Sequence, residues 1–184
     1  DRTLINAGKQ FWANGFQATS IIDIASVTGV KPGSLYKAFG DKRGMFLKCV
    51  KYYMEHTSYY AILIEEPEAP FKESLRKVFK LMVDSCDDSD RESGCLVTNS
   101  AYEMASVDEE IFDEMKKHLS EMKQTIINQI RLAQESGEID KEKDVDSLAA
   151  YIMTLIQGLL VSSRVTKNKA EMRNTIKLGL SLLD

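Results

Sequence analysis

Apolar residues recur at three- and four-residue steps along most of the chain, which is the period of an α-helix. The stretch Glu65–Pro70, with two prolines, interrupts this pattern, and the polar, acidic stretch Cys86–Gly94 interrupts it again. The run Ser106–Glu109 resembles a capping box and is expected to open a long helix. Strand-like alternation is absent from the sequence, so the expected fold class is all-α. The pattern predicts helices over residues 2–14, 42–64 and 95–105, two short helices within residues 15–46, and one that carries Phe71 to Met82. The long helix should end at Ser136-Gly137, the next should open at Asp144 or Asp146 and run through Val161, and the last should cover about residues 167–183.

Residues 15–46 contain the pattern of a helix-turn-helix. Thr19 or Ser20 provides a cap for the first of its two short helices. Gly29 stands where this helix must stop and reverse, a position that favours positive φ. Pro32 suits the first turn of the next helix, where no backbone N–H is needed. A helix-turn-helix of this kind indicates DNA binding.

The second short helix has small residues at its start and cations along its side, which fits a major groove. Residues expected to read base edges are Lys31, Gly33, Ser34 and Lys37, with Pro32 as an apolar contact to a thymine methyl group. Residues expected to contact phosphates are Thr19, Ser20, Tyr36 and Lys42.

The charge of the chain is divided unevenly. Its 184 residues carry a formal net charge of −4, which taken alone would argue against a nucleic-acid protein. Residues 1–50 hold seven Lys and Arg against three Asp, a formal charge of +4, so the remainder carries −8. A basic head on an acidic body is expected when only one domain touches phosphates.

The first quarter of the chain resembles the TetR family of bacterial transcriptional regulators. The matching positions are Gly15-Phe16, Thr19-Ser20, Ile24-Ala25, Gly29-Val30, Gly33-Ser34-Leu35-Tyr36, Phe39 and Lys42. The resemblance implies a ligand-responsive regulator, most often a repressor, that binds a palindromic double-stranded operator as a homodimer. We expect a helix-turn-helix DNA-binding domain of three helices over residues 1–46. A helical effector-binding and dimerisation domain is expected over residues 47–184.

The helix expected over residues 144–161 is apolar over more than one face. Leu155, Leu159 and their neighbours cover much of its circumference, and Gly158 and Gly179 allow close approach of helices. Such a helix must be buried on several sides, and an oligomer interface is a natural place for it. The TetR resemblance implies the same interface, a dimeric four-helix bundle.

The body also holds adaptable and polar side chains suited to a pocket for a small effector. An ordinary core explains any one of them equally well, but the resemblance implies a pocket. The expected ligand is apolar, aromatic or a lipophilic cation, with Glu103 or Asp84 as counter-ion for a cation. The candidate ligand-binding residues are Phe79, Met82, Cys95, Asn99, Tyr102, Met122, Tyr151 and Gln157.

Two alternatives remain open at this point. A redox-sensing regulator on the same fold would use Cys49, Cys86 or Cys95. A helical-bundle metal-binding protein or enzyme would use the face formed by Glu114, His118 and Glu121, but it leaves the basic head unexplained. No catalytic constellation or cofactor motif is visible, so neither enzyme activity, a cofactor nor a bound metal is expected. We expect a cytoplasmic protein without a membrane partner, because no apolar run reaches bilayer-spanning length and the odd cysteine count indicates a reducing compartment.

Overall fold

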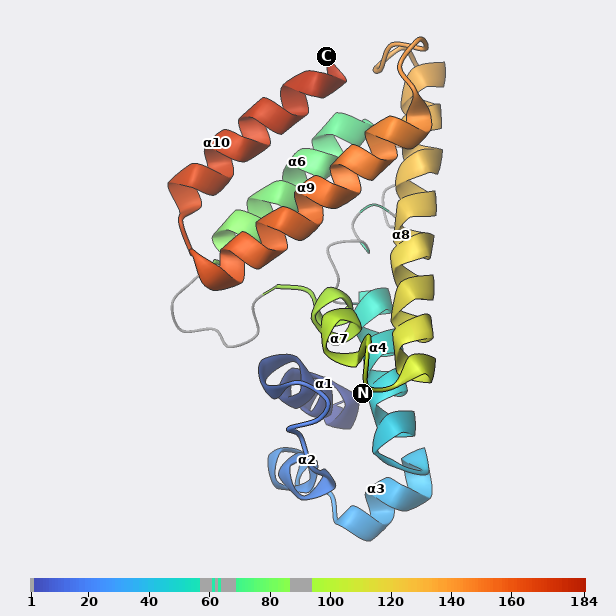
Figure 1. The fold of residues 1–184 in the computed structure, drawn as a ribbon, viewed down its shortest axis with the longest axis vertical. Coiled ribbons are helices and arrows are strands. Elements are labelled where there is room, and N and C mark those ends of the chain that lie inside the picture. Colours follow the sequence, from blue (N-terminus) through green and yellow to red (C-terminus); the bar gives the residue numbers. More distant parts are fainter. Residues whose placement is uncertain (1, 57–60, 62, 64–68, 87–93) are drawn as a thin grey trace. The chain divides into compact units, whose positions relative to one another are not determined.

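The computed structural model describes residues 2–56, 61, 63, 69–86 and 94–184, and these residues form helices without any strand. The all-α fold class predicted from the hydrophobic period is confirmed. The helices, labelled in Figure 1, are α1 (Arg2–Asn14), α2 (Ile21–Thr28), α3 (Pro32–Phe39), α4 (Lys42–His56), α6 (Phe71–Asp84), α7 (Leu96–Met104), α8 (Glu109–Glu135), α9 (Val145–Val165) and α10 (Lys169–Leu180), followed by the short 3-10 helix η1 (Ser181–Leu183).

The chain divides into two compact units. Unit 1 comprises Asp1–Ser58 with Cys95–His118, and unit 2 comprises Tyr59–Gly94 with Leu119–Asp184. Helix α8 therefore contributes residues to both units. The predicted boundary at residue 46 between a DNA-binding and an effector-binding domain stays a prediction. In the structure, the helix-turn-helix belongs to the same compact unit as α4, α7 and the start of α8.

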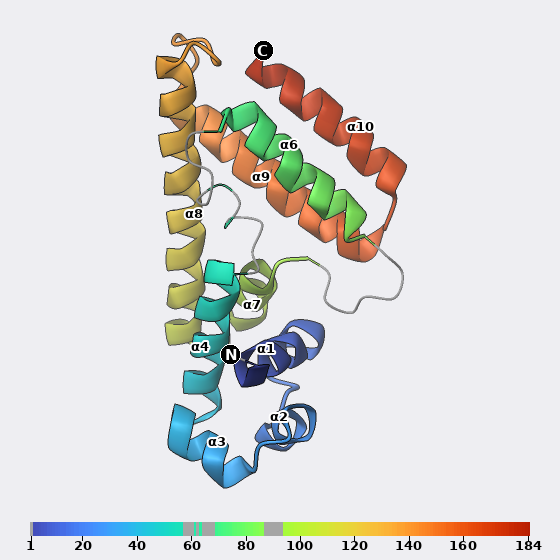
Figure 2. The same ribbon diagram turned by 180° about the vertical axis from the view of Figure 1, so that it is seen from behind.

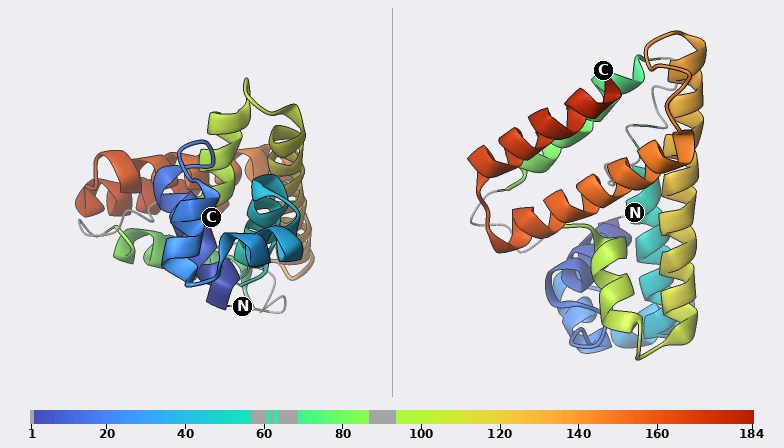
Figure 3. Two further views of the ribbon diagram at one scale, coloured as in Figure 1. Left: turned by 90° about the horizontal axis from the view of Figure 1, so that it is seen from below. Right: turned by 45° about the horizontal axis from the view of Figure 1, so that its top comes forward.

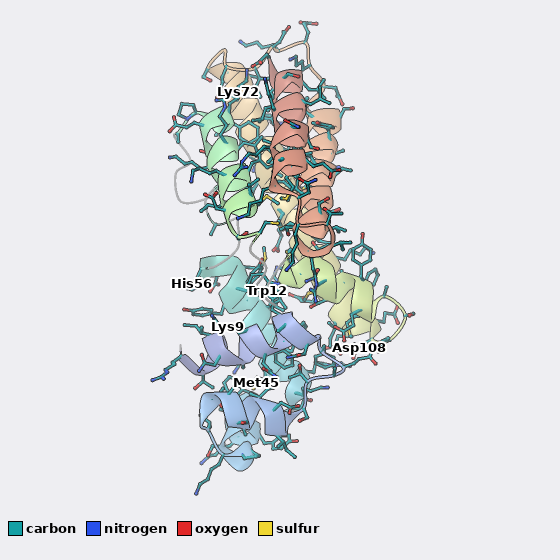
Figure 4. The ribbon with its side chains drawn as sticks, turned by 90° about the vertical axis from the view of Figure 1, so that its left-hand side faces the viewer. Lys9, Trp12, Met45, His56, Lys72 and Asp108 are labelled. Carbon is teal, nitrogen blue, oxygen red and sulfur yellow. The ribbon has the colours of Figure 1, made fainter. Side chains whose placement is uncertain are left out.

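Unit 1 is organised around a core of aromatic rings. Phe11 of α1 and Phe46 of α4 are almost fully buried and meet edge to face, with ring centroids 5.2 Å apart. The ring of Phe16 completes the cluster at 5.1 Å from Phe46. Trp12 packs edge to face on Tyr53 of α4, and Figure 4 labels it beside that helix. This core fixes α1 against α4 and leaves α2 and α3 to project from it.

Unit 2 is built from α6, α9 and α10, which lie side by side, and from the second part of α8, which runs at an angle to them (Figures 2 and 3). Their facing sides bury Phe79 and Met82 of α6 and Ile152 of α9. At the start of α6 the Glu138 carboxylate accepts two consecutive backbone N–H groups, from Phe71 and Lys72, both at 2.8 Å. This side chain caps a helix whose own N-cap residue is a proline without an N–H or a polar side chain.

Several helix ends differ from the sequence prediction. Helix α8 opens at Asp108 rather than Ser106, because Val107 and Asp108 still donate to the Met104 carbonyl and extend the end of α7. The Asp108 carboxylate then accepts from Ile111 N at 3.0 Å. Helix α9 runs four residues beyond its predicted end, to Val165. Residues 57–60 of the predicted fourth helix, and most of the two predicted breaks, lie outside the described residues.

The prediction that no apolar run could span a bilayer is wrong by length and composition. Helix α9 has 21 residues and an 18-residue window with mean hydropathy 1.5, because its polar residues are small and its charges lie near its ends. One side of α9 is buried in unit 2, including Ile152, Ile156 and Leu159, as in the core helix of a globular protein.

Candidate nucleic-acid interface

Helix α2 begins with a complete capping box. Ser20 Oγ accepts from Asp23 N at 3.1 Å, and the Asp23 carboxylate accepts from Ser20 N at 2.8 Å. The Ser20 hydroxyl also donates to Asp23, and these hydrogen bonds lower the pKa of the Asp23 carboxyl. Ser20 is exposed, as a phosphate contact requires, but its hydroxyl proton would have to leave Asp23 to reach a phosphate oxygen.

The turn and the start of α3 follow the sequence prediction. Gly29 has φ 71° and closes α2 with a hydrogen bond to the Ala25 carbonyl. Lys31 is the N-cap residue of α3 and Pro32 occupies its first turn. Leu35 is buried against the rest of the unit. The outer face of α3 is exposed and carries the predicted base-reading and phosphate-contacting residues Lys31, Pro32, Gly33, Ser34, Tyr36 and Lys37.

Gly33 has a feature that the fold does not explain. It lies in helical conformation on the exposed face, and a Cβ added there would meet no atom within 4 Å. Glycine in a helix is less favourable than alanine by roughly 0.5–1 kcal/mol. The chain's own packing would therefore accept a side chain at this position.

Two predicted phosphate contacts are corrected by the structure. Thr19 is 1% exposed, and its hydroxyl donates to the Gly15 carbonyl at 2.7 Å, so it closes the turn between α1 and α2. The ammonium of Lys42 donates to the carbonyls of Phe16, at 3.0 Å, and Gln17, at 3.5 Å, and lies 4.3 Å from the centre of the Phe16 ring. Both side chains stabilise the same turn, and neither is directed freely outward.

The structure adds a residue of α7 to this turn. Glu103 Oε2 accepts from Phe16 N at 2.9 Å, and Oε1 accepts from Gln17 N at 2.7 Å. Its sequence position gives no sign of this role, because the partners stand 86 and 87 residues away and belong to no common motif. The same contacts occupy the carboxylate that was proposed as a counter-ion for a cationic ligand.

Arg43 forms a second link within unit 1. At the start of α4, its guanidinium pairs with the carboxylates of Asp108 and Glu110, at the start of α8. The hydrogen bond from Ile111 N and the charge of Arg43 lower the pKa of the Asp108 carboxyl, whose place between α7 and α8 is labelled in Figure 4. The helix-turn-helix is thus attached to the body of unit 1 at both the α1–α2 turn and the start of α4.

Two family models match the chain. The model of the bacterial regulatory proteins of the tetR family matches residues 5–49, and that of the tetracyclin repressor-like C-terminal domain matches residues 72–178. The chain belongs to the TetR family. As a TetR regulator it is a DNA-binding transcriptional regulator rather than an enzyme, as the sequence predicted.

This TetR regulator is similar in sequence to other regulators over most of its length, and in fold to a solved structure. The HTH-type transcriptional regulator YezE of Bacillus subtilis is 30% identical over 95% of this chain and 90% of its own. The repressor ComR of Escherichia coli is 28% identical over 89% and 79% of the two chains. A cysteine-substituted TetR regulator, CifR, solved with 26-bp operator DNA, superposes with TM-score 0.88 at 21% identity over 100% of this chain and 96% of its own.

The eight predicted ligand-binding residues are distributed over both units. Cys95, Asn99 and Tyr102 belong to unit 1, and Tyr102 is 75% exposed, so its side chain lines no enclosed space in the described chain. Tyr151 lies against α10, where its hydroxyl would be 2.7 Å from a Cβ added to Gly179. The remaining four lie in unit 2, with Phe79, Met82 and Met122 buried and Gln157 half-buried.

The second proposed counter-ion, Asp84, is also occupied, because Lys80 donates to its carboxylate at 2.6 Å. The three cysteines are free and buried, and burial raises the pKa of the Cys49 thiol to about 12. A thiol in the state of Cys49 is a poor nucleophile, which argues against this cysteine as a redox switch. Within the described ranges no three His, Cys, Asp or Glu side chains are grouped to hold a metal ion.

Proposed function

We propose that this TetR regulator is a cytoplasmic repressor that binds an inverted-repeat operator as a homodimer and releases it when a small effector binds unit 2. The observation that carries the proposal is the exposed face of α3 with a glycine, Gly33, whose side-chain position is empty. The relatives named as repressors, ComR among them, support the sign of regulation.

The DNA contact is proposed through the start and the outer face of α3. Lys31, Gly33, Ser34 and Lys37 would face base edges, and Pro32 a thymine methyl group. Tyr36, which is 51% exposed, and the N-terminal end of α2 at Ser20 would lie along the phosphates. Two such heads must stand about 34 Å apart to enter successive major grooves of one duplex.

The proposed dimer face is the outer side of α9 and α10. Each helix exposes a stripe at steps of three and four residues, which includes Gly158, Val161 and Val165 on α9 and Leu178 on α10. Gly158 resembles Gly33 in that a Cβ added there would meet no atom within 4 Å. A second copy of the chain, related by a two-fold axis, would cover both stripes and approach α9 closely at this glycine.

The effector proposal rests on the composition of the unit 2 core. Phe79, Met82 and Met122 supply adaptable apolar surface, which favours an apolar, aromatic or lipophilic cationic ligand. Ser74 of α6 is 4% exposed, and its hydroxyl has no hydrogen-bond partner among the described residues. A buried hydroxyl without a partner is costly, and we infer that a polar group of the effector satisfies it.

Selection of duplexes from a random library by the purified protein tests the DNA part of the proposal. We expect enrichment of an inverted repeat whose half-sites lie about one helical turn apart, because a two-fold dimer presents two identical heads. Enrichment of a single half-site, or of no sequence at all, would contradict the proposed dimeric operator complex.

A further inference from the structure

The turn between α1 and α2 is held by side chains from two other helices of unit 1. The backbone N–H groups of Phe16 and Gln17 each donate to the carboxylate of Glu103, on α7. Both carbonyls of the same residues accept from the ammonium of Lys42, on α4. Every backbone polar group of this dipeptide is thus bound by a charged side chain, and such hydrogen bonds are stronger than those between neutral groups.

Gly15 shows how closely Glu103 approaches the turn. A Cβ at this position would lie 2.8 Å from Oε2 and 3.0 Å from Oε1, and the backbone has φ 87°. A side chain here would displace the carboxylate and strain the backbone, so the turn and Glu103 form one fitted contact. The hydroxyl of Thr19 then ties the turn back to the Gly15 carbonyl, directly before the cap residue Ser20.

We propose that Glu103 is a positioning residue for DNA binding. Its carboxylate fixes the backbone of Phe16 and Gln17, and through Thr19 and Ser20 it fixes the N-terminal end of α2. Glu103 touches no DNA in this arrangement. Displacement of α7 would withdraw the carboxylate, free the turn and lower the fraction of molecules whose head is competent to bind. This regulatory role of α7 rests on the effector response proposed above, whereas the positioning role does not.

Packing of the Phe16 ring offers a competing explanation for the order of the turn. The ring lies 5.1 Å from the Phe46 centroid and 6.1 Å from the Phe11 centroid. If this packing alone held the turn, the Glu103 carboxylate would be dispensable. The two explanations differ in what they expect from variants at residue 103 that leave all aromatic side chains in place.

Three variants separate these explanations. Glu103→Gln keeps the length of the side chain but places an amide donor against a backbone N–H. Glu103→Asp keeps the charge but is one methylene too short to reach both N–H groups. Asp113→Asn is the matched control, because it removes an exposed carboxylate in unit 1 that takes part in no described hydrogen bond or ion pair.

The first measurement needs no DNA. Amide hydrogen exchange of Phe16 and Gln17, followed by NMR, should be about 10- to 100-fold faster in both residue 103 variants, as expected when hydrogen bonds to a charged group are lost. The control should exchange at the wild-type rate. Wild-type exchange in both residue 103 variants would overturn the proposal.

The second measurement is the affinity for the duplex that the wild type selects. Glu103→Gln should bind roughly 10-fold to 100-fold more weakly, with an unchanged slope of log K against log salt, because no phosphate contact is lost. Simple electrostatics predicts the opposite sign, since removing a negative charge from a DNA-binding unit favours binding, as Asp113→Asn should show.

Affinity equal to that of the wild type in both residue 103 variants, or a reduced salt slope, would overturn the positioning role. Circular dichroism at the measuring temperature establishes whether each variant is folded. If Glu103→Gln is unfolded, the comparison is made with Glu103→Asp. Failure of the wild type to select an inverted repeat would count against the proposed operator complex alone, because the exchange measurement would still decide the role of Glu103.

Discussion

At the scale of single residues, four helical glycines of this regulator differ in the space around them. A Cβ at Gly44 would lie 2.3 Å from the Phe39 carbonyl oxygen, and one at Gly179 would lie 2.6 Å from Leu155. The chain's own packing requires glycine at those two positions. At Gly33 and Gly158 the same construction meets nothing within 4 Å, so the chain's own packing does not account for glycine at either position. These two positions lie on the proposed DNA-binding and dimer faces.

Gly33→Ala should therefore change stability and DNA binding in opposite directions. The helix gains up to about 1 kcal/mol of folding stability, because alanine is the better helix former. Operator affinity should fall by tenfold or more, because the methyl group occupies the space into which the duplex fits. Thermal melting and a titration with the selected duplex measure the two effects on one sample. A variant that melts at a higher temperature and binds the duplex as well as the wild type would show that the start of α3 does not contact DNA closely.

Asp108 supports a prediction about pH. Its carboxyl pKa is lowered by the hydrogen bond from Ile111 N and by Arg43, so the ionised form stabilises the folded state. This contribution is present above the ordinary aspartate pKa of about 4 and is lost as pH falls through the lowered value. Asp108→Asn should reduce stability by up to about 1 kcal/mol at pH 7, because asparagine can still accept from Ile111 N but no longer carries the charge that pairs with Arg43.

The same variant should differ less from the wild type at a second, acidic pH, because protonation progressively removes the wild-type charge as the pH falls through the lowered pKa of Asp108. Chemical denaturation at the two pH values, with Asp113→Asn as the control, measures this convergence. An equal deficit at both pH values would mean that Asp108 acts through packing rather than through its charge.

At the scale of helices, α9 and α10 carry apolar side chains on the side that faces away from the unit 2 core. Val161 is 49% exposed, and Val165 and Leu178 are each 73% exposed. Leu132 on α8 is also 49% exposed but lies outside these stripes. Val161 and Leu132 thus differ in position and match in exposure, which makes them a suitable pair for a test of the dimer face.

Val161→Glu and Leu178→Glu should convert the dimer to folded monomers, because each would bury an unpaired charge between two copies, at a cost of several kcal/mol. Leu132→Glu should leave the dimer intact. Sedimentation at micromolar concentration with circular dichroism distinguishes dissociation from unfolding. A wild-type monomer, or dissociation by Leu132→Glu to the same extent, would contradict the assigned face.

The helices themselves could be predicted because their signals are local. Ser20, Gly29 and Pro32 each act on backbone within a few residues, and the structure places all three as the sequence indicated. The cap of α8 lies two residues after the predicted Ser106, because the end of α7 continues through Val107. The capping motif carries no information about where the preceding helix ends. Glu103 could not be found, because its partners are far away in sequence and bind it only through their backbones.

At the scale of the whole molecule, the chain passes between the two units more than once, and α8 has residues in both units. Helices α7 and α8 lie in the part that sequence analysis assigned to the effector-binding domain, yet α7 and the start of α8 belong to unit 1 with the helix-turn-helix. Glu103 and Arg43 supply the contacts inside that unit. Under the proposed effector response, α8 would connect unit 2 to the unit that holds the helix-turn-helix, because this helix contributes residues to both.

The last prediction concerns this coupling and the effector. An apolar, aromatic or lipophilic cationic compound that binds unit 2 should increase the free energy of unfolding by mass action, by about 2.7 kcal/mol at a concentration one hundred times its Kd, and so raise the melting temperature. If the same compound weakens operator binding by some factor, the operator must weaken binding of the compound by that same factor. Thermal-shift screening followed by titrations with and without the selected duplex measures both sides of this equality.

Ser74→Ala should weaken the compound that engages the buried hydroxyl, whereas Ser163→Ala should not, because the equally buried Ser163 hydroxyl already donates to the Leu160 carbonyl at 2.7 Å. Without a compound, Ser74→Ala should be neutral or slightly stabilising, since it removes a polar group that has no partner among the described residues. If only polyanionic metabolites stabilise the protein and release the operator, the proposed apolar, aromatic or cationic class of ligand is wrong. Such compounds need cations to hold them, and the core side chains Phe79, Met82 and Met122 offer none.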